Sequence, residues 1–254
     1  MIHAQPEIAR QILSISAASL FCLAPVGAQA QLEPTTQLGS RIPVKPEAMD
    51  PVRAGVVKKG FARCLYERNS AKAPILLENS DPMSLDYSKV EMPDDNIGKY
   101  LGMANCLGDQ ADGTQSAIGF RFSPSQLRAM LQEESYLAAN RKAPTLPSGS
   151  EELVQRDYVS QGDKLHTARS LGAFADCLTF RDTRNADAIL RTTPGSKNEM
   201  AAATALAPAL GACLTEGQSL SLTPSSIRGF VADGLWNRYV RNAKPTAVEV
   251  NEKP

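Results

Sequence analysis

Three acidic residues have the type and spacing that could support hydrolytic chemistry. Glu133 and Glu134 are adjacent, and Asp233 occupies the position that matches Glu133 in the second half of the chain. Two carboxyl groups flanking a glycosidic bond form the catalytic pattern of most glycoside hydrolases, so a carboxylate-based cell-wall hydrolase is one hypothesis. Acidic residues on a helix flank are more often simply solvated, and we favour that interpretation.

Other catalytic and metal-binding patterns are weak or missing. His166 is the one histidine after residue 30, and Arg53 occupies its matching position, which favours a solvated helix position over catalysis. Asp109, Asp112 and Gly113 lack the alternating ligands and final glutamate of a calcium loop, so a turn is expected. The chain has no zinc-protease, phosphate-loop or serine-hydrolase motif. We therefore predict no metal site, no cofactor and no catalytic residue.

Arginine and aromatic side chains recur at matching positions late in both halves of the chain. Arg128 matches Arg228, and Tyr136 matches Trp236. These residue types anchor protein interfaces, so a pair of similar binding patches is one interpretation. The alternative, which we favour, is that each arginine pairs locally and each aromatic ring completes the core.

These matches belong to an internal repeat. Three pairs of segments recur in one order: 61–65 with 174–178, 106–107 with 213–214, and 123–128 with 223–228. Self-similarity of this kind reports architecture more reliably than local propensity does. We predict a duplication, with repeats at 51–139 and 158–242 related by a pseudo-two-fold axis. The remaining segments are predicted to be flexible tails and an exposed linker: 31–50, 243–254 and 140–157.

Four cysteines follow residue 30, two in each repeat: Cys64, Cys106, Cys177 and Cys213. Four cysteines allow three disulfide pairings, and the sequence does not formally choose among them. Duplication favours pairing within each repeat, which predicts Cys64–Cys106 and Cys177–Cys213. Each bridge would close a loop of about forty residues, worth roughly 4 kcal/mol in a chain-entropy estimate. A zinc site is the alternative, but the chain has no C-x-x-C pair and too few histidines.

The same series of elements is expected to position these residues in each repeat. A long helix carries the first cysteine, a short helix follows, a third helix carries the second cysteine, and a last helix begins at Ser123 or Thr223, whose hydroxyl can cap free amides. Residues 120–122 and 220–222 alternate between apolar and polar, which predicts two short strands that pair. The predicted fold class is therefore mainly helical, with two short β-strands and two disulfides.

The first thirty residues have the pattern of a secretory signal peptide. An apolar run ends in Ala28-Gln29-Ala30, so we predict a signal peptide at 1–30, cleaved after Ala30. Lipid attachment at Cys22 is an alternative, disfavoured because Leu and Phe precede it rather than small residues. No later stretch approaches the roughly twenty apolar residues of a transmembrane helix. We expect a periplasmic or secreted protein without a transmembrane segment.

Charge disfavours one class of partner. The chain carries 27 basic and 27 acidic residues, with no block of either sign. Proteins that bind polyanions usually show a basic patch, so we predict no nucleic-acid partner. An unidentified protein or envelope component is the expected partner.

Phe-x-x-Cys at 61–64 and 174–177, the Leu-Gly-Ala-Cys-Leu run at 210–214, and a last helix with arginine and aromatic residues resemble a group of secreted alphaproteobacterial proteins. The resemblance covers both repeats and is strongest over 207–236. It implies a duplicated two-cysteine helical module. It implies no activity and no site residues.

Three function classes remain after this survey. A non-enzymatic envelope or interaction role ranks first, because the residues shared by the repeats are core, cysteine and capping types. A carboxylate-based cell-wall hydrolase and a small-ligand carrier that binds between the repeats are the alternatives. A deep cleft with converging polar groups would favour the last two, and a convex bundle would favour the first.

Overall fold

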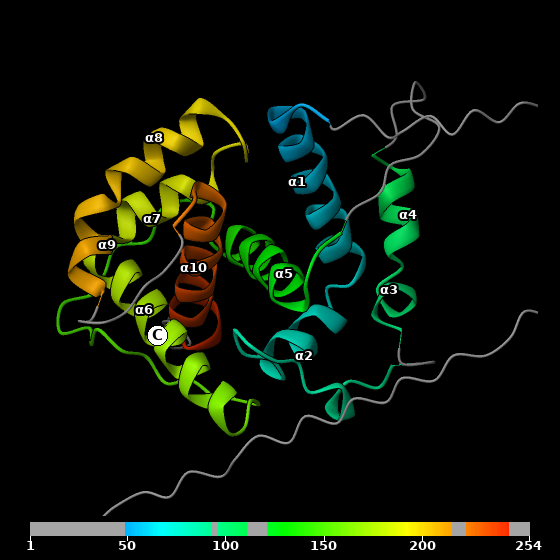
Figure 1. Cartoon of the computed structure of the whole chain (residues 1–254), viewed down its shortest axis with the longest axis horizontal. Coiled ribbons are helices and arrows are strands. Elements are labelled where there is room, and N and C mark those ends of the chain that lie inside the picture. The colour runs from blue at the N-terminus through cyan, green and yellow to red at the C-terminus, as the bar shows by residue number, and fades with distance from the viewer. Residues whose placement is uncertain (1–48, 93–95, 111–120, 215–221, 244–254) are drawn as a thin grey trace, which may run out of the picture. The chain divides into compact units, whose positions relative to one another are not determined.

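The structure is a computed structural model that describes residues 49–92, 96–110, 121–214 and 222–243. Contacts divide the chain after residue 46, and all of the described residues lie in the unit 47–254. That unit is mostly helical, as the sequence predicts (Figure 1). None of its described helices is both long and apolar enough to cross a bilayer.

The helices form two series, which we call the first half (51–139) and the second half (158–242). The first half contains α1 (Pro51–Arg68), α2 (Lys72–Glu78), the 3-10 turn η1 (Tyr87–Lys89), α3 (Ile97–Tyr100), α4 (Met103–Gly108) and α5 (Pro124–Ala139). The second half contains α6 (Asp163–Arg181), α7 (Thr183–Leu190), α8 (Lys197–Ala205), α9 (Ala207–Cys213), α10 (Pro224–Trp236) and the π-helical turn η3 (Asn237–Arg241).

Local sequence explains where the long helices begin. Asp50 accepts a hydrogen bond from the Arg53 amide at the start of α1. Ser123 and Thr223 each cap the amide three residues later at the starts of α5 and α10, and a proline follows each cap. Proline tolerates this position because its missing N–H would have no helical partner there. The predicted start of the last helix in each half is confirmed.

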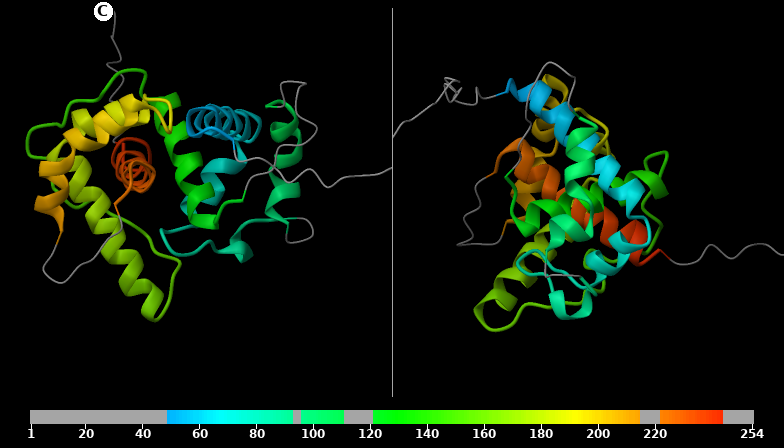
Figure 2. Two further views of the ribbon diagram at one scale, coloured as in Figure 1. Left: turned by 45° about the horizontal axis from the view of Figure 1, so that its top comes forward. Right: turned by 90° about the vertical axis from the view of Figure 1, so that its right-hand side faces the viewer.

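Helix α10 lies at the centre of the hydrophobic core. This helix packs against α5, α6 and α7, and α1 packs against the other side of α5 (Figure 2). The largest fully buried side chains include Phe61, Leu131, Tyr136 and Leu235, which come from both halves. One hydrophobic cluster therefore spans the two halves.

Both predicted disulfides are present. Cys64–Cys106 joins α1 to α4, and Cys177–Cys213 joins α6 to α9. Their Cα atoms lie 5.6 and 5.7 Å apart, within the usual range for a disulfide. Each bridge ties the first helix of its half to the helix that carries the second cysteine.

The two predicted strands are not confirmed. Residues 120, 220 and 221 lie outside the described part of the chain, and residues 121, 122 and 222 have irregular backbone. The described residues contain one isolated β-bridge, between Ser80 and Leu85. Phe122 packs on Phe61 with ring centroids 5.9 Å apart, so its apolar character serves packing just before α5 rather than a sheet.

The segment between the halves, 140–157, consists of exposed and half-buried residues, and several of its groups contact the second half. The side chain of Arg156 is 6% exposed, and its Nη2 and Nε donate to the two carboxylate oxygens of Asp176 on α6 over 2.5 and 3.0 Å. The Val154 amide donates to the same carboxylate, and Arg238 donates to the carbonyls of Glu151 and Glu152. These hydrogen bonds connect residues 151–156 to Asp176 on α6 and to Arg238 in η3.

Adding a methyl group at Gly234 or at Gly229, both on α10, is expected to change the stability in opposite directions. A Cβ at Gly234 would lie 2.3 Å from the Ala175 carbonyl oxygen, so Gly234→Ala should destabilise the fold by more than about 2 kcal/mol. A Cβ at Gly229 would meet only the Ala129 Cβ, at 3.8 Å. Gly229→Ala should therefore stabilise the helix by about 0.5–1 kcal/mol, because alanine loses less backbone entropy. Urea unfolding of both variants tests the prediction, and equal effects would contradict this packing of α10 on α6.

Candidate functional site

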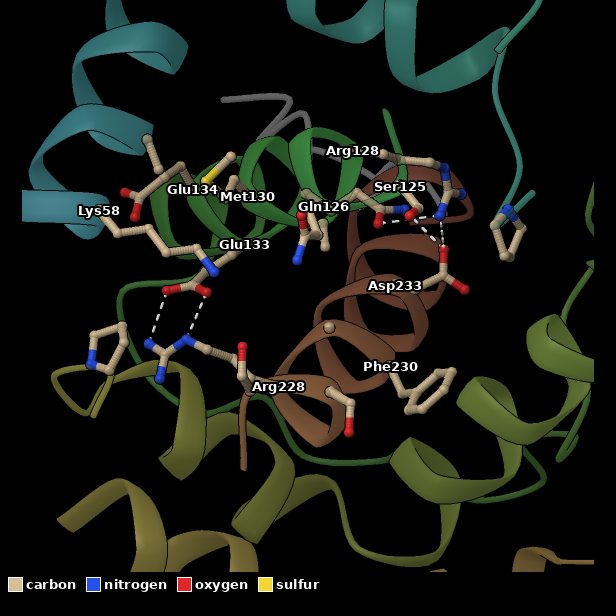
Figure 3. Close-up of a pocket in the computed structure, with 18 of the residues that line it drawn as sticks. Lys58, Ser125, Gln126, Arg128, Met130, Glu133, Glu134, Arg228, Phe230 and Asp233 are labelled. Atoms are coloured by element: carbon tan, nitrogen blue, oxygen red, sulfur yellow. Dashed lines mark hydrogen bonds and ion pairs between the residues drawn. The ribbon is translucent and has the colours of Figure 1, made fainter. Parts of the chain in front are cut away.

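A cleft lies where α5 and α10 pass one another. It has a volume of about 460 Å³ and takes its walls from α1, α5 and α10, with single residues from the neighbouring segments (Figure 3). Ala129 and Gly229 line it at the close approach of the two helices. Because both residues are small, they leave space for the cleft where the two helices cross.

Equivalent positions of the two helices line this cleft. The pairs are Ser125 with Ser225, Gln126 with Ser226, Arg128 with Arg228, Ala129 with Gly229, Met130 with Phe230, and Glu133 with Asp233. Each helix therefore presents a serine, an arginine, a small residue, a large apolar residue and an acid. The two walls of the cleft are chemically alike.

Arg128 is bound to Asp233 across the helix pair. Its Nη1 donates to Asp233 Oδ1 over 2.5 Å, and Gln132 Nε2 donates to the same oxygen over 2.8 Å. Arg156 Nη1 donates to the other oxygen over 2.6 Å. Burial alone would raise the pKa of the Asp233 carboxyl, but the charges of Arg128 and Arg156 outweigh it and hold that pKa far below its usual range.

Arg228 on α10 pairs with Glu133 on α5. Its Nε and Nη2 donate to the two carboxylate oxygens of Glu133 over 2.7 and 2.8 Å, the fork-to-fork geometry that Arg favours with carboxylates. Its Nη1 donates to Glu199 over 2.9 Å, and Lys59 also contacts Glu133. Burial would raise the pKa of Glu133, but the hydrogen bonds and charge of Arg228 outweigh it and lower that pKa.

The two ion pairs are reciprocal. The arginine of each last helix binds the acid that stands five positions further along the other last helix, and each acid has a second cation, Lys59 or Arg156. In the repeat alignment Lys59 faces Gly172. A Cβ at Gly172 would lie 3.1 Å from Arg156 Cδ, so the missing side chain leaves space for the second arginine.

The expectation that the acidic residues are solvated is wrong. Glu133, Glu134 and Asp233 are 7%, 5% and 4% exposed. Because arginines hold Glu133 and Asp233 ionised, neither carboxyl can deliver a proton near neutral pH, which a general acid must do. These two acids instead hold α5 and α10 together.

Glu134 differs from its neighbours. Its Oε1 is buried and accepts no hydrogen bond from the described residues; the nearest cation, Lys59 Nζ, lies 3.6 Å away. Arg63 Nε lies 3.7 Å from the other oxygen. Burial is the main cause that raises the pKa of this carboxyl above its ordinary value. Glu134 is thus a cleft residue with an unused acceptor.

The raised pKa of Glu134 implies that the stability of the protein depends on pH. Because the folded state disfavours the ionised form, Glu134 lowers stability at pH 7, and this cost fades as pH falls through the folded pKa and the group takes up a proton. Glu134→Gln should therefore stabilise the protein at pH 7 by about 1 kcal/mol and by less near pH 4.5. Urea unfolding at both pH values tests this, and a destabilised variant at pH 7 would contradict it.

The other candidates from the sequence fall in different places. Arg128 and Arg228 line the cleft but are buried, whereas Tyr136 and Trp236 are core residues, and the Tyr136 hydroxyl donates to Asp187 over 2.8 Å. His166 is exposed on α6, as predicted. These positions support the interpretation that the aromatics complete the core.

The calcium-loop segment is described only in part. Asp109 accepts from Arg68 Nη2 over 2.8 Å, while residues 112 and 113 lie outside the described ranges. In the part of the chain that the structure describes, no three potential metal ligands come together.

Sequence reasoning missed Lys59, Arg156 and Glu199. Lys59 and Glu199 sit among ordinary polar helix residues, and Arg156 lies in a segment without a repeat counterpart. A pairing of each repeated arginine with the repeated acid was the one available signal, since both recur at the same spacing. Comparison with known proteins adds no further residues: no protein-family model matches the chain, and neither a curated protein nor a solved structure shows significant similarity to it.

Proposed function

We propose that this chain is an exported small-ligand-binding protein whose ligand occupies the cleft between α5 and α10. The observation that carries the proposal is the cleft itself, about 460 Å³ in volume and lined by both apolar and polar side chains. Sites for small molecules are usually concave, mostly apolar and furnished with a few converging polar groups. A convex bundle would have favoured the interaction role that the sequence ranks first.

A carboxylate hydrolase is the second candidate, and Glu134 is the observation in its favour. A buried carboxyl with a raised pKa beside a cleft is the usual state of a general acid. A second, free carboxylate is needed by most such enzymes, and Glu133 and Asp233 are engaged by arginines. Ligand binding therefore explains more of the cleft than hydrolysis does.

Export and duplication complete the proposal. Two disulfides suit an oxidising compartment, which supports a signal peptide at 1–30 and a periplasmic or secreted location. Duplication is supported by the matching order of the cysteine-bearing and last helices and by the reciprocal arginine pairs. A pseudo-two-fold axis would then pass near Ala129 and Gly229. The ligand would lie between the two copies.

The test is a thermal-shift screen of the purified protein against small organic acids, alcohols, amines and sugars. We expect compounds that raise the melting temperature of the wild-type protein but not of Ala129→Phe, whose ring fills the cleft. Ala138→Phe, on an exposed position of the same helix, is the matched control and should respond like the wild type. A ligand shift that survives in Ala129→Phe would disprove binding in this cleft.

A further inference from the structure

The polar groups that line the cleft differ in whether they have bonding capacity left. Arg228 uses every guanidinium nitrogen on carboxylates, hydroxyls and carbonyls, and Glu133 is bound by two cations. Asp233 accepts three hydrogen bonds. A ligand could bind these groups only by displacing a partner. Recognition of a ligand must therefore rest on other side chains of the cleft.

Lys58 is the cation with a free charge. It lines the cleft from α1, half-buried, and forms no ion pair with another described residue. The other cations of the lining, Lys59, Arg128 and Arg228, each contact a buried carboxylate. Lys58 therefore offers the cleft its one unmatched positive charge among the described lining residues, which suits an anionic group on the ligand (Figure 3).

Glu134 offers a ligand a hydrogen-bond acceptor. Its buried Oε1 is an acceptor without a hydrogen bond, and a buried polar atom left in this state costs about 1–3 kcal/mol. A ligand that donates a hydrogen bond there would recover that cost. A cationic donor would be repelled by Lys59, whose Nζ lies 3.6 Å from this oxygen, so a neutral hydroxyl or amide N–H fits better.

Apolar side chains provide the rest of the lining. Met130 and Phe230 face the cleft from α5 and α10, and Leu171 and Pro194 join them from the second half. These groups would cover a hydrocarbon chain or ring and gain roughly 25 cal/mol for each Å² that they remove from water.

From these three features we infer that the cleft takes a small carboxylic acid with an apolar body and a neutral hydrogen-bond donor. Its carboxylate binds Lys58, and its donor binds Glu134 Oε1. Hydroxy acids and N-acylated amino acids belong to this class. The inference rests on the proposed function, because it names the chemistry of the ligand for the same cleft.

Calorimetric titration with four matched eight-carbon probes tests the inference: 3-hydroxyoctanoate, octanoate, 1-octanol and octylamine. We expect 3-hydroxyoctanoate to bind about tenfold more tightly than octanoate, and octanoate about tenfold more tightly than octanol or octylamine, as one hydrogen bond to a charged group allows. Lys58→Met should abolish the advantage of octanoate over octanol. Glu134→Leu should abolish the advantage of the hydroxyl. Lys164→Met, on an exposed position of α6, is the control and should change neither ratio.

The outcomes separate the ligand class from the cleft. Equal binding of octanoate and octanol, tightest binding of octylamine, or ratios that survive both cleft variants would overturn the inferred class. Failure of all four probes, while other compounds still give shifts that Ala129→Phe removes, would also overturn the class and leave the proposed function standing. Binding that Ala129→Phe does not weaken would overturn the proposed function itself. Circular dichroism of each variant establishes that it is folded.

Discussion

Replacing Arg228 with methionine is expected to lower the free energy of unfolding by about 3–5 kcal/mol. The guanidinium pairs with both Glu133 and Glu199, which are buried, and methionine fills a similar volume without the charge. The loss arises because two carboxylates stay in a poorly solvated interior with less positive charge beside them. Urea unfolding followed by circular dichroism measures the change.

Arg181 provides the matched control for Arg228→Met. Its side chain is 50% exposed, and its Nη2 lies 3.1 Å from Glu152 Oε2. Exposed ion pairs contribute about 0–1 kcal/mol, so Arg181→Met should change stability by less than 1 kcal/mol. Similar losses for the two variants would show that the buried position of Arg228 is wrong. Adding Glu133→Gln to Arg228→Met should restore part of the loss, because it removes one unpaired charge.

Removing one disulfide is expected to cost nearly as much. The Cys177–Cys213 bridge spans 36 residues, and the chain-entropy estimate for a loop of that length is about 4 kcal/mol. Cys177→Ala with Cys213→Ala should therefore lower the free energy of unfolding by about 4 kcal/mol, since the unfolded chain regains the freedom that the bridge removes. Urea unfolding under non-reducing conditions is the measurement.

The first-half bridge serves as the comparison. Cys64–Cys106 spans 42 residues, so the double alanine variant at these positions should lose a similar amount. A loss below about 1 kcal/mol for either pair would mean that the bridge does not restrict the unfolded chain as the estimate assumes. Peptide mapping without reduction should recover each bridge intact in the wild-type protein.

The disulfides and the last helices could be predicted because each depends on a local or duplicated signal. Cysteines that recur at matching places favour one pairing, and a hydroxyl followed by proline marks the first turn of a helix. The two short strands are not confirmed, for a related reason. Phe122 alternates with polar neighbours, but its ring packs on Phe61 from irregular backbone, and three residues do not distinguish these two cases.

The cleft could be predicted only in part. The sequence contains Arg128, Glu133, Arg228 and Asp233, yet single acidic and basic residues are solvated so often that burial was not the expected state. Whether two such residues meet depends on the crossing of α5 with α10, which is a property of the packed helices. Arg156 adds a second difficulty, because a polar segment between the two halves gives no sign that one of its side chains binds two buried carboxylates.

The reciprocal pairs of Arg128 and Arg228 have a consequence for folding cooperativity. Each half keeps a buried arginine that binds a carboxylate of the other half, so neither of these two ion pairs can form while one half is unfolded. Half-folded chains are therefore poor intermediates at equilibrium, and the two halves should melt in one calorimetric transition. On the export route proposed above, the chain would reach its stable state only after its last helix had crossed the membrane.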